Sequence, residues 1–540
     1  MRPFLTLHHP AAARAWYERG LWRPDTMYGL AAGHARARPD AIACIDGSRT
    51  LSWRQLREWI DGVALALTSI GAIAGDRTAV WSDNRLESIV FTLASMRVGA
   101  ACNPGLHRTY TGREVAALLD RLSARVLFTK PGWGADGKPG MAQPEIGAVP
   151  SLKAILTPDA FPGPAPNPDA PNADPDKVAY LAFTSGTTGA PKCVMHSDNT
   201  ILANARDLVR DWGHRADMVL LTLSPLSHHI AWVAIAQWLL TGCTLVTDDP
   251  PPGMSRLDWL LAMKADYVMG VPTHAMDILA EQRRRGLAGL GAVRVFYMAG
   301  APIPPSVAEA FVTQGVRPQN VYGMTENSSH QYTHPEDETA TIVGTCGRGG
   351  GAYEVRIFDP ADADRPVPTG TVGQIGGRGA ALMLGYFANQ HATETSFNRD
   401  GWFMSGDLGV LDAAGNLKIE GRLKDLIIRG GHNIYPAHIE ALALRHESVG
   451  RCAAFPVADE RLGERVCLAV AGAVEAVDML EHLAREGLSR YDMPEFFVRL
   501  EEFPLTASGK ILKRELVEMT RRGELIPVSV RYTSEKEHNS

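Results

Sequence analysis

The sequence predicts an α/β fold: a large N-terminal domain of layered α/β subdomains, a small β-rich subdomain, and a small α+β C-terminal domain. Short apolar strands alternate with amphipathic helices over roughly the first 340 residues, which is typical of parallel sheets covered on both faces. Glycine-rich turns then separate short strands, and a charged segment follows residue 423. A chain of 540 residues is long enough for several such units.

The N-terminal elements follow from apolar periodicity. A hairpin is expected over residues 41–52 around the turn Asp46-Gly47, followed by an amphipathic helix over 53–70. The strand Thr78–Trp81 and the helix Leu86–Val98 come next. Later strands are expected at Val126–Thr129, Val178–Phe183, Met218–Leu223, Thr244–Thr247, Tyr267–Val271 and Val293–Ala299, and helices at Thr200–Trp212, Trp232–Leu240 and Pro304–Val312.

Two regions break this alternation. Residues 157–176 are so rich in proline that neither a helix nor a sheet interior is possible, so an extended surface connector is expected. The β-rich subdomain is expected from about residue 342, with strands at Glu354–Phe358, Gly373–Gly376 and Leu417–Glu420. The C-terminal segment is expected to hold helices at Pro436–His446 and Val477–Leu488 and strands near Cys452–Val457 and Val466–Ala471.

The composition excludes several classes of protein. Hydrophobic residues make up 45% and charged residues 21% of the chain, which argues against disorder, collagen and coiled coil. The net charge of −6 gives no basic surface for nucleic acid. Seven cysteines without a CxxC pair argue against a disulfide framework and a cysteine-based zinc site, and favour a reducing, cytoplasmic location. The most apolar stretch, Ile230–Val246, is too short for stable membrane insertion.

A loop with the chemistry of a phosphate site follows the strand Val178–Phe183. Its sequence is Thr184-Ser185-Gly186-Thr187-Thr188-Gly189-Ala190-Pro191-Lys192. Glycines allow backbone N–H groups to face an anion, hydroxyls add donors, and the lysine adds a positive charge. The spacing differs from a Walker A loop. We therefore expect phosphate contact here, with a polar surface loop as the alternative.

Residues Thr184–Lys192 resemble the signature loop of the acyl-adenylate-forming superfamily, which includes acyl-CoA synthetases, nonribosomal-peptide adenylation domains and beetle luciferases. The chain is most similar to the acyl-CoA synthetases, of the aryl-acid or alicyclic-acid CoA ligase type. The resemblance continues in order through the substrate gate Pro225–His228, the adenine-binding segments Ala299–Pro302 and Val321–Glu326, the ribose-binding segment Gly401–Gly409, the hinge region Gly421–Asp425 with Asn433–Pro436, and the catalytic-lysine motif Pro504–Ile511.

The resemblance implies two domains and two half-reactions. Residues 1–423 would bind ATP and a carboxylic acid, and residues 424–540 would form a mobile domain that carries the catalytic lysine. The carboxylate would attack the α-phosphorus of ATP, releasing pyrophosphate and leaving an acyl-AMP. Coenzyme A would then take the acyl group and release AMP. ATP, Mg²⁺ and coenzyme A are the implied cofactors, and the resemblance is compatible with a homodimer.

Four catalytic residues follow from the matched motifs. Lys510 would bridge the carboxylate and the α-phosphate, and Thr325 would bond the α-phosphate. Glu326 would hold Mg²⁺, since hard carboxylate oxygens suit this ion. His228 would sit beside the acid's carboxylate. The alternatives are a surface lysine, a surface glutamate and a structural histidine.

The binding residues are matched in the same way. Lys424 would be the hinge residue about which the C-terminal domain turns. Gly430 and Gly431 would let the pantetheine arm of coenzyme A pass, and Arg97 would contact coenzyme A phosphates. The nucleotide-binding residues would be Thr184, Ser185, Gly186, Thr187, Thr188, Gly189, Lys192, Gly300, Ala301, Pro302, Tyr322, Gly323, Asp407 and Arg422.

The acid itself is the least constrained part of the prediction. Residues Asn327–His330 are more polar than a fatty-acid tunnel needs, and Trp16–Trp22 resembles aryl-acid and alicyclic-acid ligases. An aromatic or cyclic carboxylic acid is therefore expected, with a medium- or long-chain fatty acid as the alternative. Other hypotheses are an adenylating enzyme that loads a carrier-protein phosphopantetheine, a non-catalytic nucleotide- or acyl-binding protein, and a luciferase-like oxygenase.

Overall fold

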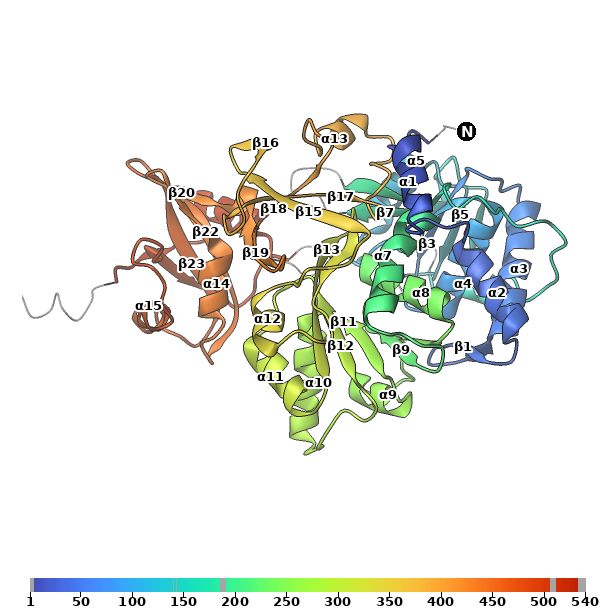
Figure 1. The fold of residues 1–540 in the computed structure, drawn as a ribbon, viewed down its shortest axis with the longest axis horizontal. Coiled ribbons are helices and arrows are strands. Elements are labelled where there is room, and N and C mark those ends of the chain that lie inside the picture. The colour runs from blue at the N-terminus through green and yellow to red at the C-terminus, as the bar shows by residue number, and fades with distance from the viewer. Residues whose placement is uncertain (1–3, 139, 142, 185–190, 506–510, 533–540) are drawn as a thin grey trace, which may run out of the picture. The chain divides into compact units, whose positions relative to one another are not determined.

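The computed structural model describes residues 4–138, 140–141, 143–184, 191–505 and 511–532 (Figure 1). The chain forms two compact units, each described by itself below. The first comprises Met1–Val355, Gly377–Phe403 and Ala414–Leu417, and the second Arg356–Gly376, Met404–Ala413 and Lys418–Ser540. Both units combine helices and sheets, which confirms the predicted α/β class. The domain boundary predicted between residues 423 and 424 stays a prediction.

An eight-stranded sheet in the first unit has the order β14-β13-β12-β11-β9-β10-β1-β2. Its six central strands are parallel, and antiparallel pairs close both edges. The strands are β1 (Ile42–Ile45), β2 (Thr50–Ser52), β9 (Val219–Thr222), β10 (Thr244–Thr247), β11 (Tyr267–Gly270), β12 (Val295–Ala299), β13 (Arg317–Met324) and β14 (Ser328–Tyr332).

A six-stranded sheet in the same unit has the order β6-β5-β3-β4-β7-β8. Its strands run parallel except for the hairpin β7–β8. Strand β8 was not predicted, because its residues Lys-Cys-Val-Met-His-Ser mix polar and apolar types. The strands are β3 (Arg77–Trp81), β4 (Ala101–Asn103), β5 (Val126–Thr129), β6 (Ala154–Leu156), β7 (Val178–Thr184) and β8 (Lys192–Ser197).

Five helices pack between these sheets. One buried cluster joins one face of each sheet, for example Val80 and Phe128 on one side and Leu245 and Met269 on the other, with apolar residues of the helices. Both faces of the parallel strands are therefore covered, as their continuous apolar character requires. The helices are α2 (Met27–Ala37), α3 (Trp53–Ser69), α4 (Leu86–Val98), α7 (Asp198–Asp211) and α8 (His229–Thr241).

Shorter helices cover the two outer faces, which gives five alternating layers. A second cluster joins the eight-stranded sheet to α9 (Arg256–Ala262), α10 (Pro272–Arg284) and α11 (Pro305–Thr313). A third joins the six-stranded sheet to α5 (Gly112–Leu122) and α6 (Pro144–Gly147). The unit also contains the helices α1 (Pro10–Glu18), α12 (Thr339–Gly344) and α13 (Gln390–Glu394).

The proline-rich connector has only one short 3-10 turn, Pro158–Ala160, and is otherwise without regular structure up to residue 177. Trp59 fastens it to α3 by donating from Nε1 to the carbonyl oxygen of Pro162 at 2.8 Å. Gly62 is also needed here, because a Cβ at this position would lie 2.1 Å from the carbonyl oxygen of Gly163. The connector is therefore a fixed part of the surface.

Two further sheets complete the fold. One is a five-stranded sheet of order β16-β15-β17-β18-β19. In the second unit, β22 and the path β21-β20-β23-β24-β25 form a sheet with an apolar cluster on each face. The elements are β15 (Tyr353–Asp359), β16 (Asp362–Pro366), β17 (Gly373–Gly379), β18 (Phe403–Leu411), β19 (Leu417–Arg422), β20 (Ile427–Arg429), β21 (His432–Ile434), α14 (Pro436–Ala443), β22 (Val449–Asp459), β23 (Gly463–Gly472), α15 (Ala476–Arg485), β24 (Phe496–Arg499), α16 (Lys513–Arg521) and β25 (Val528–Ser529).

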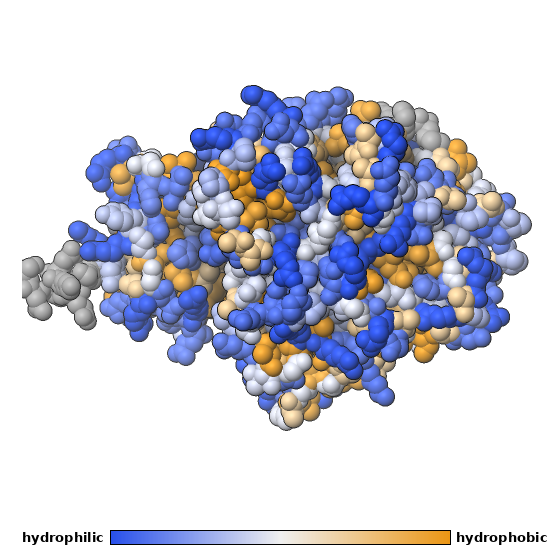
Figure 2. Space-filling view, viewed as in Figure 1, coloured by the Kyte–Doolittle hydropathy of each residue, from blue (hydrophilic) through white to orange (hydrophobic). Residues whose placement is uncertain are grey.

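Hydrophilic residues cover most of the face drawn in Figure 2, with smaller hydrophobic areas between them. Within the described ranges, no helix combines the length and the apolar character that a membrane crossing needs.

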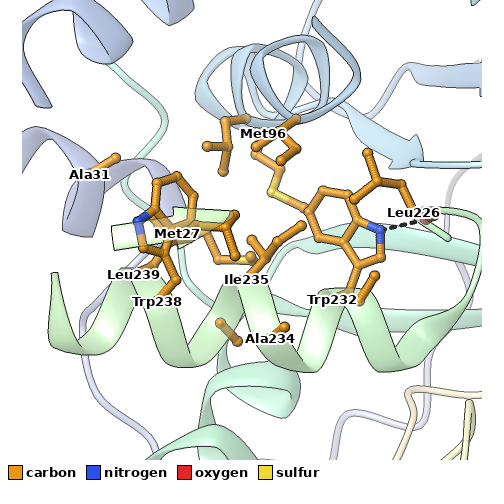
Figure 3. Close-up of a cluster of buried hydrophobic side chains, with 14 of the residues drawn as sticks. Met27, Ala31, Met96, Leu226, Trp232, Ala234, Ile235, Trp238 and Leu239 are labelled. Carbon is orange, nitrogen blue, oxygen red and sulfur yellow. Dashed lines mark hydrogen bonds between the residues drawn. The ribbon is translucent and has the colours of Figure 1, made fainter. Parts of the chain in front are cut away.

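Helix α8 is the centre of the largest buried cluster (Figure 3). Trp232 donates from Nε1 to the carbonyl oxygen of Leu226 at 2.9 Å, and Trp238 donates to that of Ala43 at 2.8 Å. Trp238 also stacks on Trp53, with ring centroids 5.0 Å apart. The helix begins three residues earlier than predicted, at His229, so that His228 is its N-cap residue.

We expect Trp238→Ala to lower the free energy of unfolding by about 3–5 kcal/mol, because it removes a stacked ring and leaves the Ala43 carbonyl without its donor. The measurement is the urea midpoint of the first unfolding transition. Ile73→Ala, at a site that is 56% exposed, is the control and should shift the midpoint little. Equal shifts for both variants would contradict the central role of α8.

Candidate active site

The predicted adenine-binding segments follow two neighbouring parallel strands. Ala299 at the end of β12 pairs with Val321 in β13, so Gly300–Pro302, which follow β12, lie next to Tyr322–Glu326, the segment in which β13 ends at Met324. Gly300 has a φ of +89°, which turns the chain sharply at this edge, and Gly300, Ala301 and Pro302 are exposed. Carboxyl ends of parallel strands are where open α/β sheets bind ligands.

Gly323 is required by the tight connection between β13 and β14. A Cβ at this position would lie 1.7 Å from the carbonyl oxygen of Ser328, which no side chain can accommodate. The neighbouring Tyr322 is half-buried, and its ring meets the ring of His330 edge-on at 5.4 Å. The backbone therefore fixes the position of the Tyr322 ring.

Glu326 and Lys192 lie on either side of a tyrosine that sequence analysis missed. Tyr386 donates from Oη to Oε1 of Glu326 at 2.9 Å, and Nζ of Lys192 lies 4.6 Å from the centre of its ring. Burial and the Glu326 carboxylate raise the pKa of Tyr386, so that its hydroxyl stays a donor. Because Tyr386 is 60 residues beyond Glu326 in the chain, no local pattern could have linked them.

Two stacked histidines tie three segments of the site together. His196 on β8 donates from Nε2 to the carbonyl oxygen of Thr325 at 2.6 Å. His229 on α8 places Nε2 2.9 Å from Oγ of Ser328 and Nδ1 3.1 Å from Oη of Tyr180. The two rings lie 5.5 Å apart and nearly parallel. The phosphate-loop hairpin, the gate helix and the β13–β14 turn thus share one buried polar network.

Both histidines are held uncharged. Burial lowers the pKa of His196 to about 4, although its hydrogen bond to the Thr325 carbonyl acts in the opposite direction. Burial and the neighbouring His196 lower the pKa of His229 well below its usual range. The network therefore acts by hydrogen bonding rather than by charge at neutral pH. The sequence motifs mark His228 but neither His196 nor His229 as a candidate site residue.

His228, the predicted gate residue, is half-buried at the start of α8. Its ring lies 4.8 Å from that of His107, in the segment after β4. Burial lowers the pKa of His107. Over the part of the chain that the structure describes, no group of three His, Cys, Asp or Glu residues could hold a metal ion.

The phosphate loop and the terminal lysine are only partly described. Thr184 ends β7 and pairs with Lys192 in β8, and its Oγ1 donates to the carbonyl oxygen of Lys192 at 3.4 Å. Lys510 lies outside the described residues; before and after it, Leu505 bridges to Ile511. The other predicted loop residues, Ser185, Gly186, Thr187, Thr188 and Gly189, also lie outside them.

Three predicted sites lie within the second unit: the ribose-binding pair, the hinge residue and the glycine turn for coenzyme A. Asp407 on β18 and Arg422 on β19 form an ion pair, with Oδ1 and Nε 3.3 Å apart. Desolvation and the Arg422 guanidinium lower the pKa of Lys424, in the turn after β19. Gly430 and Gly431 form the two-residue turn between β20 and β21, and both have a positive φ, +58° and +85°, as a tight hairpin turn needs.

Arg97 occupies an internal position. It is 4% exposed, donates from Nε to Oδ1 of Asp61 at 2.8 Å and from Nη2 to the carbonyl oxygen of Asp169 at 2.7 Å. It therefore fastens the connector to α3 and α4. A surface pocket of about 370 Å³, lined also by Arg36 and Arg57, adjoins it. The predicted contact of Arg97 with coenzyme A phosphates stays a prediction.

We expect the free energy of unfolding to fall as the pH falls from about 6.5 to 4. In this range the histidines bind protons in the unfolded chain, whereas the buried imidazoles stay uncharged in the folded state. His196→Gln keeps a donor toward Thr325 but cannot be protonated. It should reduce the slope in this window by up to about 1.4 kcal/mol per pH unit. Urea midpoints at several pH values measure this slope. His391→Gln, at an exposed site on α13, is the control, and an unchanged slope in His196→Gln would contradict the prediction.

Comparison with known proteins places this geometry in a family. Residues 32–387 match the AMP-binding enzyme family, and residues 438–510 match the AMP-binding enzyme C-terminal domain. A medium-chain fatty-acid–CoA ligase of Escherichia coli K12 is 29% identical over 535 residues, covering 95% of this chain and 93% of the relative.

Two further relatives extend the likeness to cyclic acids. The 3-[(3aS,4S,7aS)-7a-methyl-1,5-dioxo-octahydro-1H-inden-4-yl]propanoyl:CoA ligase of Mycobacterium tuberculosis is 31% identical, covering 90% of this chain and 97% of the relative. The structure of O-succinylbenzoate coenzyme A synthetase from Bacillus subtilis in complex with AMP superposes with a TM-score of 0.81 at 25% identity, covering 91% of this chain and 98% of that one. The chain therefore belongs to the AMP-binding enzyme family.

Proposed function

We propose that this protein is an ATP-dependent carboxylic acid:CoA ligase that works through an acyl-AMP intermediate. The observation that carries the proposal is the meeting of Lys192, Tyr386 and Glu326 beside the Thr325 segment, at the carboxyl ends of parallel strands. The match of both family regions and the near full-length likeness to CoA ligases support the same activity. ATP, coenzyme A and a small carboxylic acid are its substrates.

The first half-reaction joins two anions, so the site must offset charge and fix the line of attack. A carboxylate oxygen of the acid forms a bond to the α-phosphorus while the bond to the bridging oxygen of pyrophosphate breaks. We assign Lys192 and Lys510 to the phosphate and carboxylate charges and the Thr325 hydroxyl to an α-phosphate oxygen. Tyr322 would lie against adenine, and Asp407 with Arg422 would bind the ribose.

The residues present suit a magnesium ion at Glu326. Its carboxylate is only 8% exposed, and one oxygen is fixed by Tyr386; a hard oxygen donor held in this way is what Mg²⁺ prefers. When bound, the ion would offset phosphate charge. Tyr386 keeps the carboxylate oriented whether or not the ion is present.

In the second half-reaction the thiol of coenzyme A attacks the acyl carbon, and AMP leaves. We assign Lys424 to the hinge that exchanges the two arrangements of the C-terminal domain. The narrow Gly430-Gly431 turn would let the pantetheine arm pass without side-chain obstruction. The seven unpaired cysteines suit a reducing compartment such as the cytoplasm, and the family resemblance leads us to include a homodimer in the proposal.

For the acid we propose an aromatic or cyclic carboxylic acid. The fused-ring acid and the succinylbenzoate in the names of two relatives support a ring, whereas the E. coli relative favours a medium-chain fatty acid as the second candidate. Loading of a carrier-protein phosphopantetheine is the alternative use of the same acyl-AMP.

We expect pyrophosphate release that requires both ATP and an acid, and AMP with an acyl thioester once coenzyme A is added. A coupled pyrophosphate assay over aryl, alicyclic and medium-chain acids, with and without coenzyme A, measures both. The absence of pyrophosphate with every acid would overturn the proposed function. Thioester formation on carrier-protein pantetheine but not on coenzyme A would favour the alternative.

We expect Lys510→Ala to lower acid-dependent pyrophosphate release by at least about 100-fold, since electrostatic stabilisation of this kind is typically worth that much. Thioester formation from supplied acyl-AMP and coenzyme A should stay nearly intact, because it does not use this lysine. Lys418→Ala, at an exposed lysine of the second unit, is the matched control. Equal loss of both half-reactions in Lys510→Ala would contradict the assignment.

A further inference from the structure

His330 on β14 has a buried imidazole that forms no hydrogen bond within the part of the chain that the structure describes. Its side chain is 1% exposed, and among the described residues neither Nδ1 nor Nε2 has a hydrogen-bond partner. Its ring is held by two aromatic rings instead, Tyr353 at 4.3 Å and Tyr322 at 5.4 Å. Leaving a buried polar group unmatched costs about 1–3 kcal/mol, so such a group needs an explanation.

The three polar residues that precede His330, Asn327, Ser328 and Ser329, all have hydrogen-bond partners. Asn327 accepts from the backbone N–H of Met324 and donates to Oη of Tyr353. The hydroxyl of Ser328 bonds His229. That of Ser329 lies 2.5 Å from Oη of Tyr297. Three of the four polar side chains in this short stretch therefore have hydrogen-bond partners within the protein. The fourth, that of His330, has none among the described residues.

The position of His330 makes a ligand the best explanation. Its ring touches Tyr322, which the proposed function assigns to the nucleotide, and it follows Glu326 by four residues on the strand that leaves the same turn. A phenylalanine would pack between Tyr322 and Tyr353 without an unmatched nitrogen. The imidazole is therefore better suited to binding than to packing.

The chemistry of the ring limits what it can bind. Burial lowers the pKa of His330 to about 3, so the ring is neutral at physiological pH and offers one N–H donor and one acceptor nitrogen. A second carboxylate would bring an anion into this buried position with no positive charge on the imidazole to match it. A hydroxyl or a keto oxygen fits, because each can pair with a neutral donor or acceptor.

We propose that His330 is a specificity-determining residue that hydrogen-bonds a neutral hydroxyl or keto group on the carboxylic acid substrate. This inference rests on the proposed function and narrows it to ring acids that carry an uncharged oxygen substituent. A pocket built to bond such a group discriminates strongly against an analogue that lacks it, since the polar residue is then left unmatched.

The test compares kcat/KM for pyrophosphate release with paired acids: benzoate against its 2-, 3- and 4-hydroxy derivatives, and cyclohexanecarboxylate against its 4-oxo and 4-hydroxy derivatives. The wild type should prefer the oxygenated member of at least one pair by about tenfold or more. In His330→Phe that ratio should fall toward one, and His330→Gln, which keeps a donor and an acceptor, should retain part of it.

His214→Phe is the matched control. Nε2 of His214 is likewise buried without a hydrogen-bond partner among the described residues, and the ring also packs on a tyrosine, Tyr267, at 4.3 Å. Tyr267, however, begins β11, at the amino ends of the parallel strands. This variant should keep the wild-type ratio.

Three results would overturn the inference. The first is an unchanged ratio in His330→Phe, and the second is a wild-type preference for the unsubstituted acid in every pair. The third is a thermal midpoint of His330→Phe several degrees below that of the wild type, which would reveal a structural partner for the imidazole. If pyrophosphate is released but the kcat/KM ratio is the same in His330→Phe as in the wild type, only this inference fails. If no acid gives pyrophosphate, the proposed function fails as well.

Discussion

The register between β12 and β13 is the constraint on which the site depends. Because Ala299 pairs with Val321 in a parallel ladder, the two segments that follow must leave the sheet at the same edge. The apolar helix α8 fixes this sheet from one face, and its first residues, His228 and His229, reach the same edge. The fold thereby gathers chemistry-bearing residues from distant parts of the chain.

The polar residues at this edge fall into two groups: those that bond other protein groups and those that are proposed to bind the nucleotide. Ring nitrogens of His196 and His229 form hydrogen bonds with Thr325, Ser328 and Tyr180, all within the protein. Such buried and matched networks rigidify the segments that they join. Because both rings are neutral, they hold the Thr325 segment without adding charge where phosphates are proposed to bind. The positive charge is proposed to come instead from Lys192, the first residue of β8, and from Lys510.

Sequence patterns predicted the parts of the fold that depend on local apolar runs. Thr78–Trp81, Val126–Thr129 and Thr244–Thr247 are strands because every residue in them fits a buried sheet, and the structure contains them. The sequence did not reveal β8, whose buried polar residues His196 and Ser197 become part of a sheet by pairing with β7. Tyr386, His196 and the matching of Arg97 with Asp61 were also missed, since each depends on contacts between residues far apart in the chain.

The same distinction separates residues that a family motif can identify from those that set a particular substrate. Gly323 is dictated by the backbone, because any side chain there would collide with Ser328, so the chemistry of the acid has no influence on it. Neither the backbone nor the packing requires a histidine at position 330. An apolar ring would fill the same space without burying a nitrogen that has no hydrogen-bond partner. We therefore attribute His330 to ligand binding, because the fold does not require an imidazole there and a buried polar group without a partner lowers stability. Specificity in this enzyme is therefore best sought where the structure leaves a polar group unmatched rather than where the motifs are strongest.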